Sequence, residues 1–345
     1  MRKYHMPKFV YSILLCLALP FVPLKLLWRA MKQPEYLKNW SERFGFYNLT
    51  LNNKEIIWLH CVSVGETRAA EPLVNALKST YPKHQILITH GTPTGRETSR
   101  KLFGNNVLRV YLPYDLPFAI NGFLNYFAPK IGLIMETELW FNLISACNHR
   151  DIPLLLLNAR LSEKSAHGYR KLGDLAIKGV QGLNAVAAQT KEDAARLQSL
   201  GAQHLTVVGN LKFDVKPPED AFEKGLQLRK QLGKKPVFLA ASTRDGEEAL
   251  ILDAIKDLDL QTIIVPRHPQ RFDEVATLFK QRDIDFALKT SLNRNSMKAN
   301  KHEASRPYII LGNTMGELFT YYAACDFAFI GGSLLNYGGQ NLIAV

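Results

Sequence analysis

Short apolar runs alternate with longer amphipathic stretches between about residue 55 and residue 332, and this alternation constrains the fold more than any other feature. Each run is five to seven residues long, which is typical of strands buried on both faces of a parallel sheet. The stretches between them, such as residues 66–80, 116–127 and 191–201, are long enough for helices. We expect strands at residues 56–62, 85–90, 107–112, 131–135, 152–158, 184–189, 205–209, 236–242, 261–266, 285–289, 308–312 and 326–332.

A proline-containing break at residues 216–220 divides this alternation into two blocks. Repeated strand–helix–strand units with short connections predict parallel sheets with right-handed crossovers and helices on both faces. The sequence therefore predicts an α/β protein with two doubly wound, Rossmann-like domains, at residues 46–215 and 216–345, that face each other across a cleft. The basic polar stretch at residues 291–306 is expected to form a mobile surface loop.

The first 45 residues have a different character. They contain eight Lys or Arg against two Glu, a net charge of +6, which is half of the formal +12 of the whole chain. The cations flank residues 9–24, which carry no charge. Such a pattern is typical of a membrane-attached segment rather than of the basic face of a nucleic-acid-binding protein. We therefore expect residues 1–45 to be a membrane anchor with a basic flank, and expect membrane lipids but no nucleic acid as partners.

The form of this anchor stays open. Sixteen uncharged residues form about 24 Å of helix, less than the roughly 30 Å of a bilayer's hydrocarbon core. Pro20 and Pro23 argue against one straight span, and no small-residue cleavage site follows the run. A short single span, a monotopic surface anchor and a buried core helix are the three interpretations.

Disulfide and metal chemistry are not expected. No C-x-x-C pair occurs among the four widely separated cysteines, which are Cys16, Cys61, Cys147 and Cys325. The two D-x-D strings, at residues 257–259 and 283–285, lie away from the glycine-rich segments, so we expect them on the solvated surface and expect no metal site.

Polar and glycine-rich clusters follow most of the expected strands. In open α/β sheets, ligands bind beyond the carboxyl ends of the strands. The earlier clusters contain Ser63, Gly65, Glu66, Thr92, Thr94, Glu136 and Glu138. The later clusters contain Lys212, Ser242, Thr243, Arg244, Arg267, His268, Met315, Gly316, Glu317, Gly331, Gly332 and Ser333. Because both blocks carry such clusters, we expect two ligands to meet in the cleft.

With these clusters in place, the chain resembles the 3-deoxy-D-manno-octulosonic acid (Kdo) transferases of lipopolysaccharide synthesis. The resemblance is carried by SVGE (63–66), TPTG (92–95), YLPYDLP (111–117), METELW (135–140), NARLSEKSAHGY (158–169), GNLKFD (209–214), PRHPQRF (266–272), TMGEL (314–318) and FIGGSL (329–334). It implies a GT-B glycosyltransferase without a cofactor, on the cytoplasmic side of the inner membrane. It also implies transfer of Kdo from the donor CMP-Kdo to the tetraacylated glucosamine disaccharide of a lipid A precursor.

Glu66 is the expected general base. It would accept the proton of the acceptor hydroxyl as that oxygen attacks the anomeric carbon opposite CMP, an inverting displacement. A helix start beside Gly65 suits a carboxylate, and the alternative is a carboxylate that only caps the helix. The resemblance implies that Glu136 and Glu138 shape the donor or acceptor pocket, with Glu138 favoured. The alternative for Glu138 is a cap of a helix that begins at Leu139.

The donor carries a phosphate and a carboxylate, and cations near strand ends are their expected ligands. Lys212, Arg244 and Arg267 meet this description. The family usually has His at the position of Arg244. The substrate site of the first domain is further expected to include Ser63, Gly65, Thr92 and Thr94.

Further donor contacts are expected in the second domain. Ser242, Thr243 and residues 331–333 offer hydroxyl and backbone N–H groups suited to a phosphate. Residues 315–317 are expected to line the nucleotide pocket, and His268 either contacts the donor or is structural.

The chain departs from the family pattern at its last residues. The family continues through G-G-H-N-x-x-E-P into further α/β structure, whereas here Gln340 replaces the His, Asn341 is kept, and Ala344 replaces the nucleotide-binding Glu. We therefore expect a truncated second domain with an unpaired strand edge and low activity. The alternatives are another GT-B transferase or a sugar-nucleotide epimerase, and a non-catalytic protein that binds CMP-sugar or lipid A.

Overall fold

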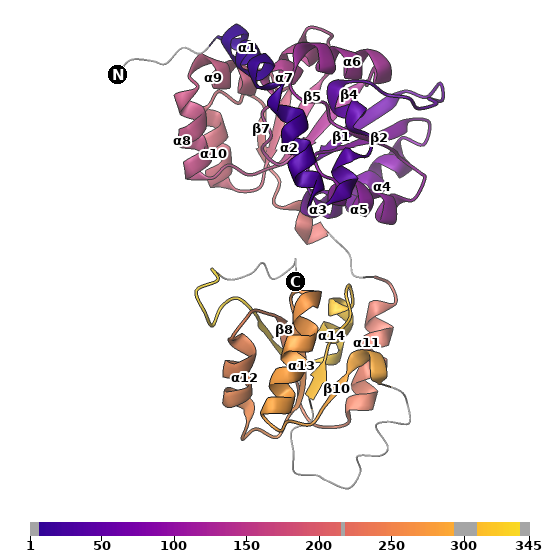
Figure 1. Cartoon of the computed structure of the whole chain (residues 1–345), viewed down its shortest axis with the longest axis vertical. Helices are drawn as coiled ribbons and strands as arrows, with labels where there is room; N and C mark the ends of the chain where they lie inside the picture. The colour runs from indigo at the N-terminus through magenta and orange to yellow at the C-terminus, as the bar shows by residue number, and fades with distance from the viewer. Residues whose placement is uncertain (1–6, 215–217, 293–308, 339–345) are drawn as a thin grey trace. The chain divides into compact units, whose positions relative to one another are not determined.

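The computed structural model describes residues 7–214, 218–292 and 309–338, and the chain divides into two units, Met1–Val215 and Lys216–Val345 (Figure 1). Each unit contains one parallel sheet with helices on both faces, so the predicted α/β class with two parallel-sheet domains is confirmed. The expectations for Gln340, Asn341 and Ala344, and most of the expected loop at 291–306, lie outside the described residues.

The first unit is built on a seven-stranded sheet in the order β3-β2-β1-β4-β5-β6-β7. Its strands are β1 (Ile56–Cys61), β2 (Gln85–His90), β3 (Leu108–Tyr111), β4 (Ile131–Met135), β5 (Leu154–Ala159), β6 (Ala185–Ala188) and β7 (Leu205–Val207). Its helices are α3 (Val64–Ala69), α4 (Glu71–Thr80), α5 (Pro93–Phe103), α6 (Pro117–Phe127), α7 (Phe141–Asn148), α8 (Glu163–Lys171), α9 (Asp174–Gln181) and α10 (Lys191–Ser199), followed by the 3₁₀ turn η3 (Leu211–Asp214). The chain reverses its direction across the sheet between β1 and β4, the switch point at which ligands bind in such sheets.

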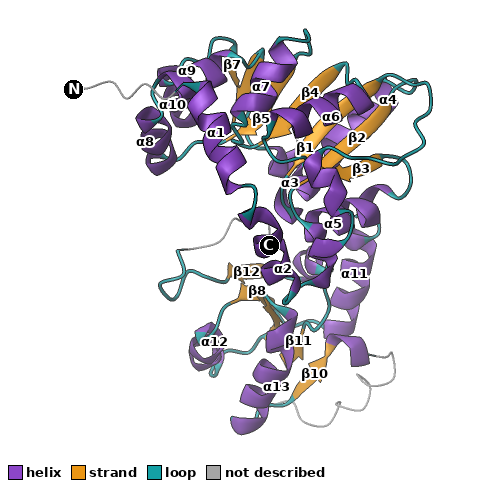
Figure 2. Ribbon diagram, turned by 45° about the horizontal axis from the view of Figure 1, so that its top comes forward, coloured by secondary structure: helices purple, strands orange, loops and turns teal. Residues whose placement is uncertain are grey.

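Both faces of this sheet are buried, which explains why its strands read as continuous apolar runs. Successive residues of a strand point to opposite faces. Trp58 of β1 packs in a cluster with Phe123 of α6, whereas Leu59 packs in a second cluster with Val74 of α4. The ribbon views show helices above and below the strands (Figure 2).

The single helix expected at residues 66–80 is wrong, because the structure has two helices there, α3 and α4. Pro72 lies in the first turn of α4. A proline has no N–H to donate to the preceding turn, so a continuous helix would lose that hydrogen bond and clash with the ring. The break shortens α3 to the six residues that carry Glu66.

The second unit contains a five-stranded parallel sheet in the order β10-β11-β9-β8-β12. Its strands are β8 (Val237–Thr243), β9 (Gln261–Pro266), β10 (Phe286–Leu288), β11 (Ile309–Leu311) and β12 (Phe327–Ile330). Its helices are α11 (Ala221–Leu232), α12 (Glu247–Ile255), α13 (Phe272–Gln281) and α14 (Leu318–Ala324), with short 3₁₀ turns η4 (Pro269–Arg271) and η5 (Lys289–Ser291). The direction of winding reverses between β8 and β12, which makes this edge the switch point of the second sheet.

The amino-terminal segment forms two helices, α1 (Lys8–Ala18) and α2 (Phe21–Ala30), followed by the 3₁₀ turns η1 (Pro34–Leu37) and η2 (Trp40–Phe44). Within the described residues, no single helix has both the length and the apolar composition to cross a bilayer, although α1 and α2 meet these criteria as a pair bent by 55°. No residue of α1 is buried, so the interpretation of this helix as a core helix is wrong.

Polar contacts hold α1 against α7 and against Asp115, which lies in the loop before α6. The Tyr11 hydroxyl donates to Asp115 at 2.9 Å, and the Ser12 hydroxyl donates to Asn142 Oδ1 at 2.9 Å. The Tyr11 ring also meets the ring of Phe141 edge-on, with centroids 5.3 Å apart. These contacts fix the orientation of α1 on the first unit (Figure 1).

Candidate active site

Glu66 lies in the first turn of α3, directly after β1, and its carboxylate turns back toward the strand. Ser63 is the N-cap of α3 and accepts a hydrogen bond from the Glu66 N–H. In return, the Glu66 carboxylate accepts from the Ser63 hydroxyl at 2.8 Å and from the Val62 N–H at 2.7 Å. This reciprocal arrangement resembles a capping box, which S-x-x-E encodes locally. Gly65 beside it is exposed, whereas Glu66 is only 7% exposed.

Burial raises the pKa of Glu66, and the negative charge of Glu136 raises it further, against the lowering effect of the hydrogen bonds from Val62 and Ser63. A carboxylate whose pKa lies above its ordinary value is a stronger base. The capping role and the basic character therefore coexist in the same side chain, because the cap fixes the geometry while burial raises the proton affinity.

Glu136 and Glu138 follow β4, which pairs with β1 in the sheet. Glu136 has a φ of +57°, a left-handed conformation that costs a non-glycine residue about 1–3 kcal/mol. This turn ends the alternation of side chains along β4, so the strand itself does not set the relative orientation of the two carboxylates. Burial raises the pKa of Glu138 to about 7, and the charges of Glu66 and then Glu136 contribute. The three carboxylates thus interact at the switch point of the first sheet.

The alternative role of Glu138 as a helix cap is wrong. The helix after β4 begins at Phe141 rather than at Leu139. Its first N–H groups are bound by Asp115, which accepts from Asn142 N at 2.9 Å and from Leu143 N at 2.8 Å. Glu138 is therefore not needed to cap α7.

Thr92 joins the end of β2 to the end of β1. It is the N-cap of α5, where it accepts from Gly95 N at 3.1 Å, and its hydroxyl donates to the Val62 carbonyl at 3.2 Å. The Thr94 hydroxyl donates to the Thr92 hydroxyl at 3.3 Å. Both threonines therefore lie at the same sheet edge as Glu66, where the short α3 contacts α5.

Lys212 lies in η3, which contacts α3. The side chain of Asn158, at the end of β5, accepts from Leu211 N at 3.0 Å, and Asn210 accepts from Lys212 N at 3.0 Å. Asn158 is buried and has a φ of +52°. Its side-chain amide thus sets the position of η3, a function that the sequence analysis did not assign, because the bonded residues are 53 apart in the chain.

At the switch point of the second unit, the ends of β8 and β12 are in close contact. Gly331 N donates to the Ala241 carbonyl at 2.8 Å. A Cβ atom at Gly331 would lie 2.3 Å from the carbonyl oxygen of Ser242, so only glycine fits there without a backbone shift. Ser242 itself has a φ of +52°, and strained residues of this kind cluster at functional sites.

Two arginines come together beside this switch point. Burial lowers the pKa of Arg267, and the positive charge of Arg244 lowers it further. The Arg244 Nε is buried and has no hydrogen-bond partner within the part of the chain that the structure describes. A bound anion would relieve the repulsion between the two guanidinium groups.

Several groups expected to bind phosphate already have partners within the protein. Thr243 is fully buried and its hydroxyl donates to Glu248 at 2.6 Å. The Gly332 N–H donates to the Glu247 carboxylate, and the Ser333 hydroxyl donates to the Ile330 carbonyl. In this structure these groups of Thr243, Gly332 and Ser333 are thus already hydrogen-bonded within the protein, and their role in binding phosphate stays a prediction.

The remaining expected residues of the second unit lie in other loops. His268 is exposed, directly before η4. Met315 is 64% exposed, and Gly316 has a φ of +82°. Glu317 accepts a hydrogen bond from the Thr314 hydroxyl at 2.6 Å. Their roles in binding the nucleotide stay predictions, as does that of Asn341, which lies outside the described residues.

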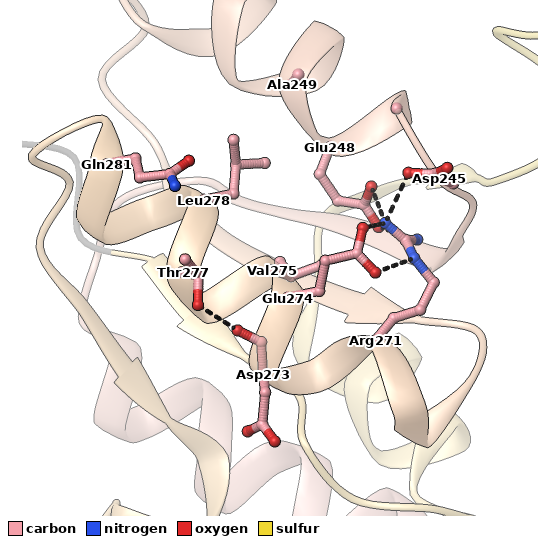
Figure 3. A pocket seen from close by; sticks show the side chains of 11 residues that line it. Asp245, Glu248, Ala249, Arg271, Asp273, Glu274, Val275, Thr277, Leu278 and Gln281 are labelled. Carbon is pink, nitrogen blue, oxygen red and sulfur yellow. Dashed lines mark hydrogen bonds and ion pairs between the residues drawn. The ribbon is translucent and has the colours of Figure 1, made fainter.

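Glu247, Glu248 and Arg271 were not identified from the sequence. Arg271 binds Glu248 through both guanidinium ends, at 2.7 and 3.0 Å, and also contacts Glu274 (Figure 3). Glu248, Arg271 and Glu274 line a groove of about 490 Å³ that lies between the start of α12 and the length of α13. None of the residues predicted from the sequence lines this groove. In the sequence, the only indication was the acidic pair Glu247 and Glu248 at the start of an expected helix. Such pairs are too common at helix starts to predict a functional role.

Over residues 7–214, 218–292 and 309–338, no group of three or more His, Cys, Asp or Glu side chains is placed to hold a metal ion. Metal independence of the reaction stays a prediction.

Comparison with known proteins identifies the family. Residues 38–215 match the family described as 3-Deoxy-D-manno-octulosonic-acid transferase (kdotransferase). The chain is 37% identical to the 3-deoxy-D-manno-octulosonic acid transferase of Haemophilus influenzae, over 97% of this chain and 78% of that protein. It is 41% identical to the enzyme of the same name from Bordetella pertussis, over 83% of this chain and 68% of that protein.

Among solved structures, UDP-GlcNAc 2-epimerase from Neisseria meningitidis superposes with a TM-score of 0.51 at 13% identity, over 80% of this chain and 77% of that one. This similarity concerns the fold alone and is in keeping with the predicted GT-B type. The sequence matches extend across both units and include the segments that carry Glu66, Glu136 and Glu138. The chain belongs to the Kdo transferase family of glycosyltransferases.

Proposed function

We propose that this protein transfers Kdo from CMP-Kdo to the glucosamine disaccharide of a lipid A precursor in lipopolysaccharide synthesis. The observation that carries the proposal is the 37% identity to a named Kdo transferase across 97% of the chain. This identity favours sugar transfer over the epimerase alternative, which is supported only by the similarity of fold.

Glu66 acts as the general base in this proposal. An acceptor hydroxyl attacks the anomeric carbon of Kdo and its proton passes to the Glu66 carboxylate. The bond between that carbon and the phosphate oxygen breaks, and CMP leaves with the electron pair. Because the hydroxyl attacks from the face opposite CMP, the configuration inverts. The buried position of Glu66, its raised pKa and the hydrogen bonds that orient it from Val62 and Ser63 support this role. The negative charge of Glu136 favours uptake of the proton.

Arg244 and Arg267 bind the anionic groups of the donor. The reaction leaves negative charge on the phosphate of CMP, and fixed cations stabilise such charge most effectively where little water competes. The mutual repulsion of the two arginines and the unpaired Nε of Arg244 support an anion at this position. Lys212 adds a positive charge on the first unit, near α3.

We further propose that α1 and α2 lie on the cytoplasmic face of the inner membrane as a surface anchor. These helices expose large apolar side chains, among them Phe9 at 71%, Phe21 at 67% and Trp28 at 59%. On α2, Lys25 lies between Phe21 and Trp28 in the sequence, and Arg29 follows Trp28. Cations next to apolar side chains are expected where a helix contacts anionic headgroups. The hydrogen bonds of α1 to Asp115 and Asn142 favour a surface anchor over a span, because a spanning α1 would have to break them.

The direct test is incubation of the purified full chain, in mixed micelles, with CMP-Kdo and a tetraacylated lipid A precursor. Mass spectrometry of the lipid should show addition of Kdo, and free CMP should appear in equal amount. Release of CMP without a glycosylated lipid would contradict lipid A as the acceptor. Absence of both products from a folded protein would contradict the proposed activity.

A further inference from the structure

The Glu247 carboxylate is fully buried at the start of α12 and is bound by backbone N–H groups from two loops. Gly332 N lies 2.7 and 2.8 Å from its two oxygens, Leu334 N lies 3.1 Å from Oε1, and Arg244 N lies 2.8 Å from Oε2. Three N–H donors around one buried carboxylate compensate much of the cost of removing the charge from water. The carboxylate therefore joins the loop after β8 to the loop after β12.

These contacts differ from those of an ordinary acidic residue in a first helical turn. Such a residue usually interacts with the N–H groups of its own helix. The Glu247 carboxylate instead reaches Gly332 and Leu334, which are 85 and 87 residues away in sequence. The two joined loops flank the switch point between β8 and β12, and the first of them carries Arg244.

We propose that Glu247 is a positioning residue that builds the anion site of the donor nucleotide by holding residues 331–334 against the loop that carries Arg244. The proposal rests on the proposed function, since it concerns the donor site of that reaction. Glu247 does not touch the donor itself, because its oxygens are buried and occupied. It fixes the Arg244 backbone on one side and the glycine-rich loop on the other, so the Arg244 side chain starts from a defined position beside Arg267.

Glu248 provides a matched control. It is the next residue of the same helix, is equally buried and is also a carboxylate. Its hydrogen bonds run to the Thr243 hydroxyl and to Arg271 rather than to residues 331–334. Glu247→Gln and Glu248→Gln therefore remove the same charge from the same helix turn but release different partners.

The first measurement is hydrogen exchange of the full-length protein, read by mass spectrometry on peptides that contain Gly332 and Leu334. A glutamine can accept hydrogen bonds only through one oxygen, and its NH₂ group would face N–H donors. We expect exchange of these amides to accelerate about tenfold or more in Glu247→Gln. In Glu248→Gln we expect faster exchange around Arg271 and unchanged rates at Gly332 and Leu334.

The second measurement is the affinity for CMP alone, by titration calorimetry, together with steady-state kinetics. We expect Glu247→Gln to raise the Kd for CMP and the KM for CMP-Kdo about tenfold, with the KM for the lipid acceptor unchanged. Glu247→Asp keeps the charge on a shorter side chain, so it should recover part of the affinity, and it replaces Glu247→Gln if the latter does not fold.

The outcomes separate the two proposals. Failure of the wild-type chain to bind CMP would contradict the proposed function. A wild-type chain that binds CMP, with folded Glu247 variants that bind it equally well or leave the exchange of Gly332 and Leu334 unchanged, would overturn the positioning role while leaving the proposed function intact.

Discussion

Replacing Glu138 with glutamine should stabilise the first unit at neutral and alkaline pH, because it removes one of three interacting carboxylates. Burial and the charges of Glu66 and Glu136 raise the pKa of Glu138 from 4.5 to about 7. The protonated form is therefore favoured by folding. The raised pKa therefore contributes fully to the free energy of unfolding below pH 4.5, and this contribution is lost as the pH rises through 7.

The size of the effect follows from the shift. At about 1.4 kcal/mol per pKa unit, and with allowance for partial exposure of the side chain, the ionised group costs about 2–3 kcal/mol above pH 7. In a unit of this size, where 1 kcal/mol shifts Tm by about 2–4 °C, that corresponds to about 4–12 °C in Tm. Glu138→Gln should therefore match the wild type at pH 4.5 and exceed it by this amount at pH 8.

Tryptophan fluorescence is a suitable assay because all four tryptophans, Trp28, Trp40, Trp58 and Trp140, belong to the first unit. Thermal unfolding would be followed by their emission from pH 4.5 to pH 8.5. Glu163→Gln, which removes an exposed carboxylate on α8, serves as the control and should shift Tm little at any pH. Equal Tm values of wild type and Glu138→Gln at pH 8 would refute the electrostatic coupling of the carboxylates.

Three further predictions concern the donor site and the anchor. Gly331→Ala should lower the free energy of unfolding by about 1–3 kcal/mol in chemical denaturation and weaken CMP binding, because the added Cβ would lie 2.3 Å from the Ser242 carbonyl oxygen. An unchanged free energy of unfolding would show that the loops after β8 and β12 can move apart without cost. Arg244→Ala and Arg267→Ala should each raise the KM for CMP-Kdo about 10- to 100-fold, because each substitution removes one charge-assisted hydrogen bond. An unchanged KM in both variants would show that the two arginines do not bind the donor. The full chain should float with vesicles that contain anionic lipid and less with neutral ones, and Phe21→Asp should reduce this binding; flotation independent of lipid charge and of this substitution would contradict the surface anchor.

The strands were the most predictable part of the fold. Residues 85–90, 131–135 and 261–266 are strands with the boundaries expected from the sequence, since burial on both faces requires a continuous apolar run. The helix pattern at residues 66–80 was recognised, but its break at Pro72 was overlooked. A proline is tolerated in the first turn of a helix but breaks a helix that has already begun. The sequence around Pro72 does not state where the helix starts, so the two cases look the same.

The candidate site was predictable only where its geometry is local. The S-x-x-E spacing of Ser63 and Glu66 encodes a bond within one turn, and the structure contains it. The Glu136 N–H donates to the Leu157 carbonyl, and the Glu247 carboxylate accepts from Gly332 N, so the surroundings of both residues include neighbours that are distant in sequence. For the same reason, Thr243 was expected to bind ligand although its hydroxyl is bound to Glu248.

The central claim is that Glu66 removes the proton of the acceptor hydroxyl during Kdo transfer. Its most direct test is the single-turnover rate of Glu66→Gln with saturating CMP-Kdo and tetraacylated lipid A precursor. Glutamine keeps the size of the side chain and can still accept from the Val62 N–H, so the fold should persist. We predict a rate about 10²- to 10⁴-fold below that of the wild type, with the Kd for CMP unchanged. A rate within a few-fold of the wild type would contradict the account.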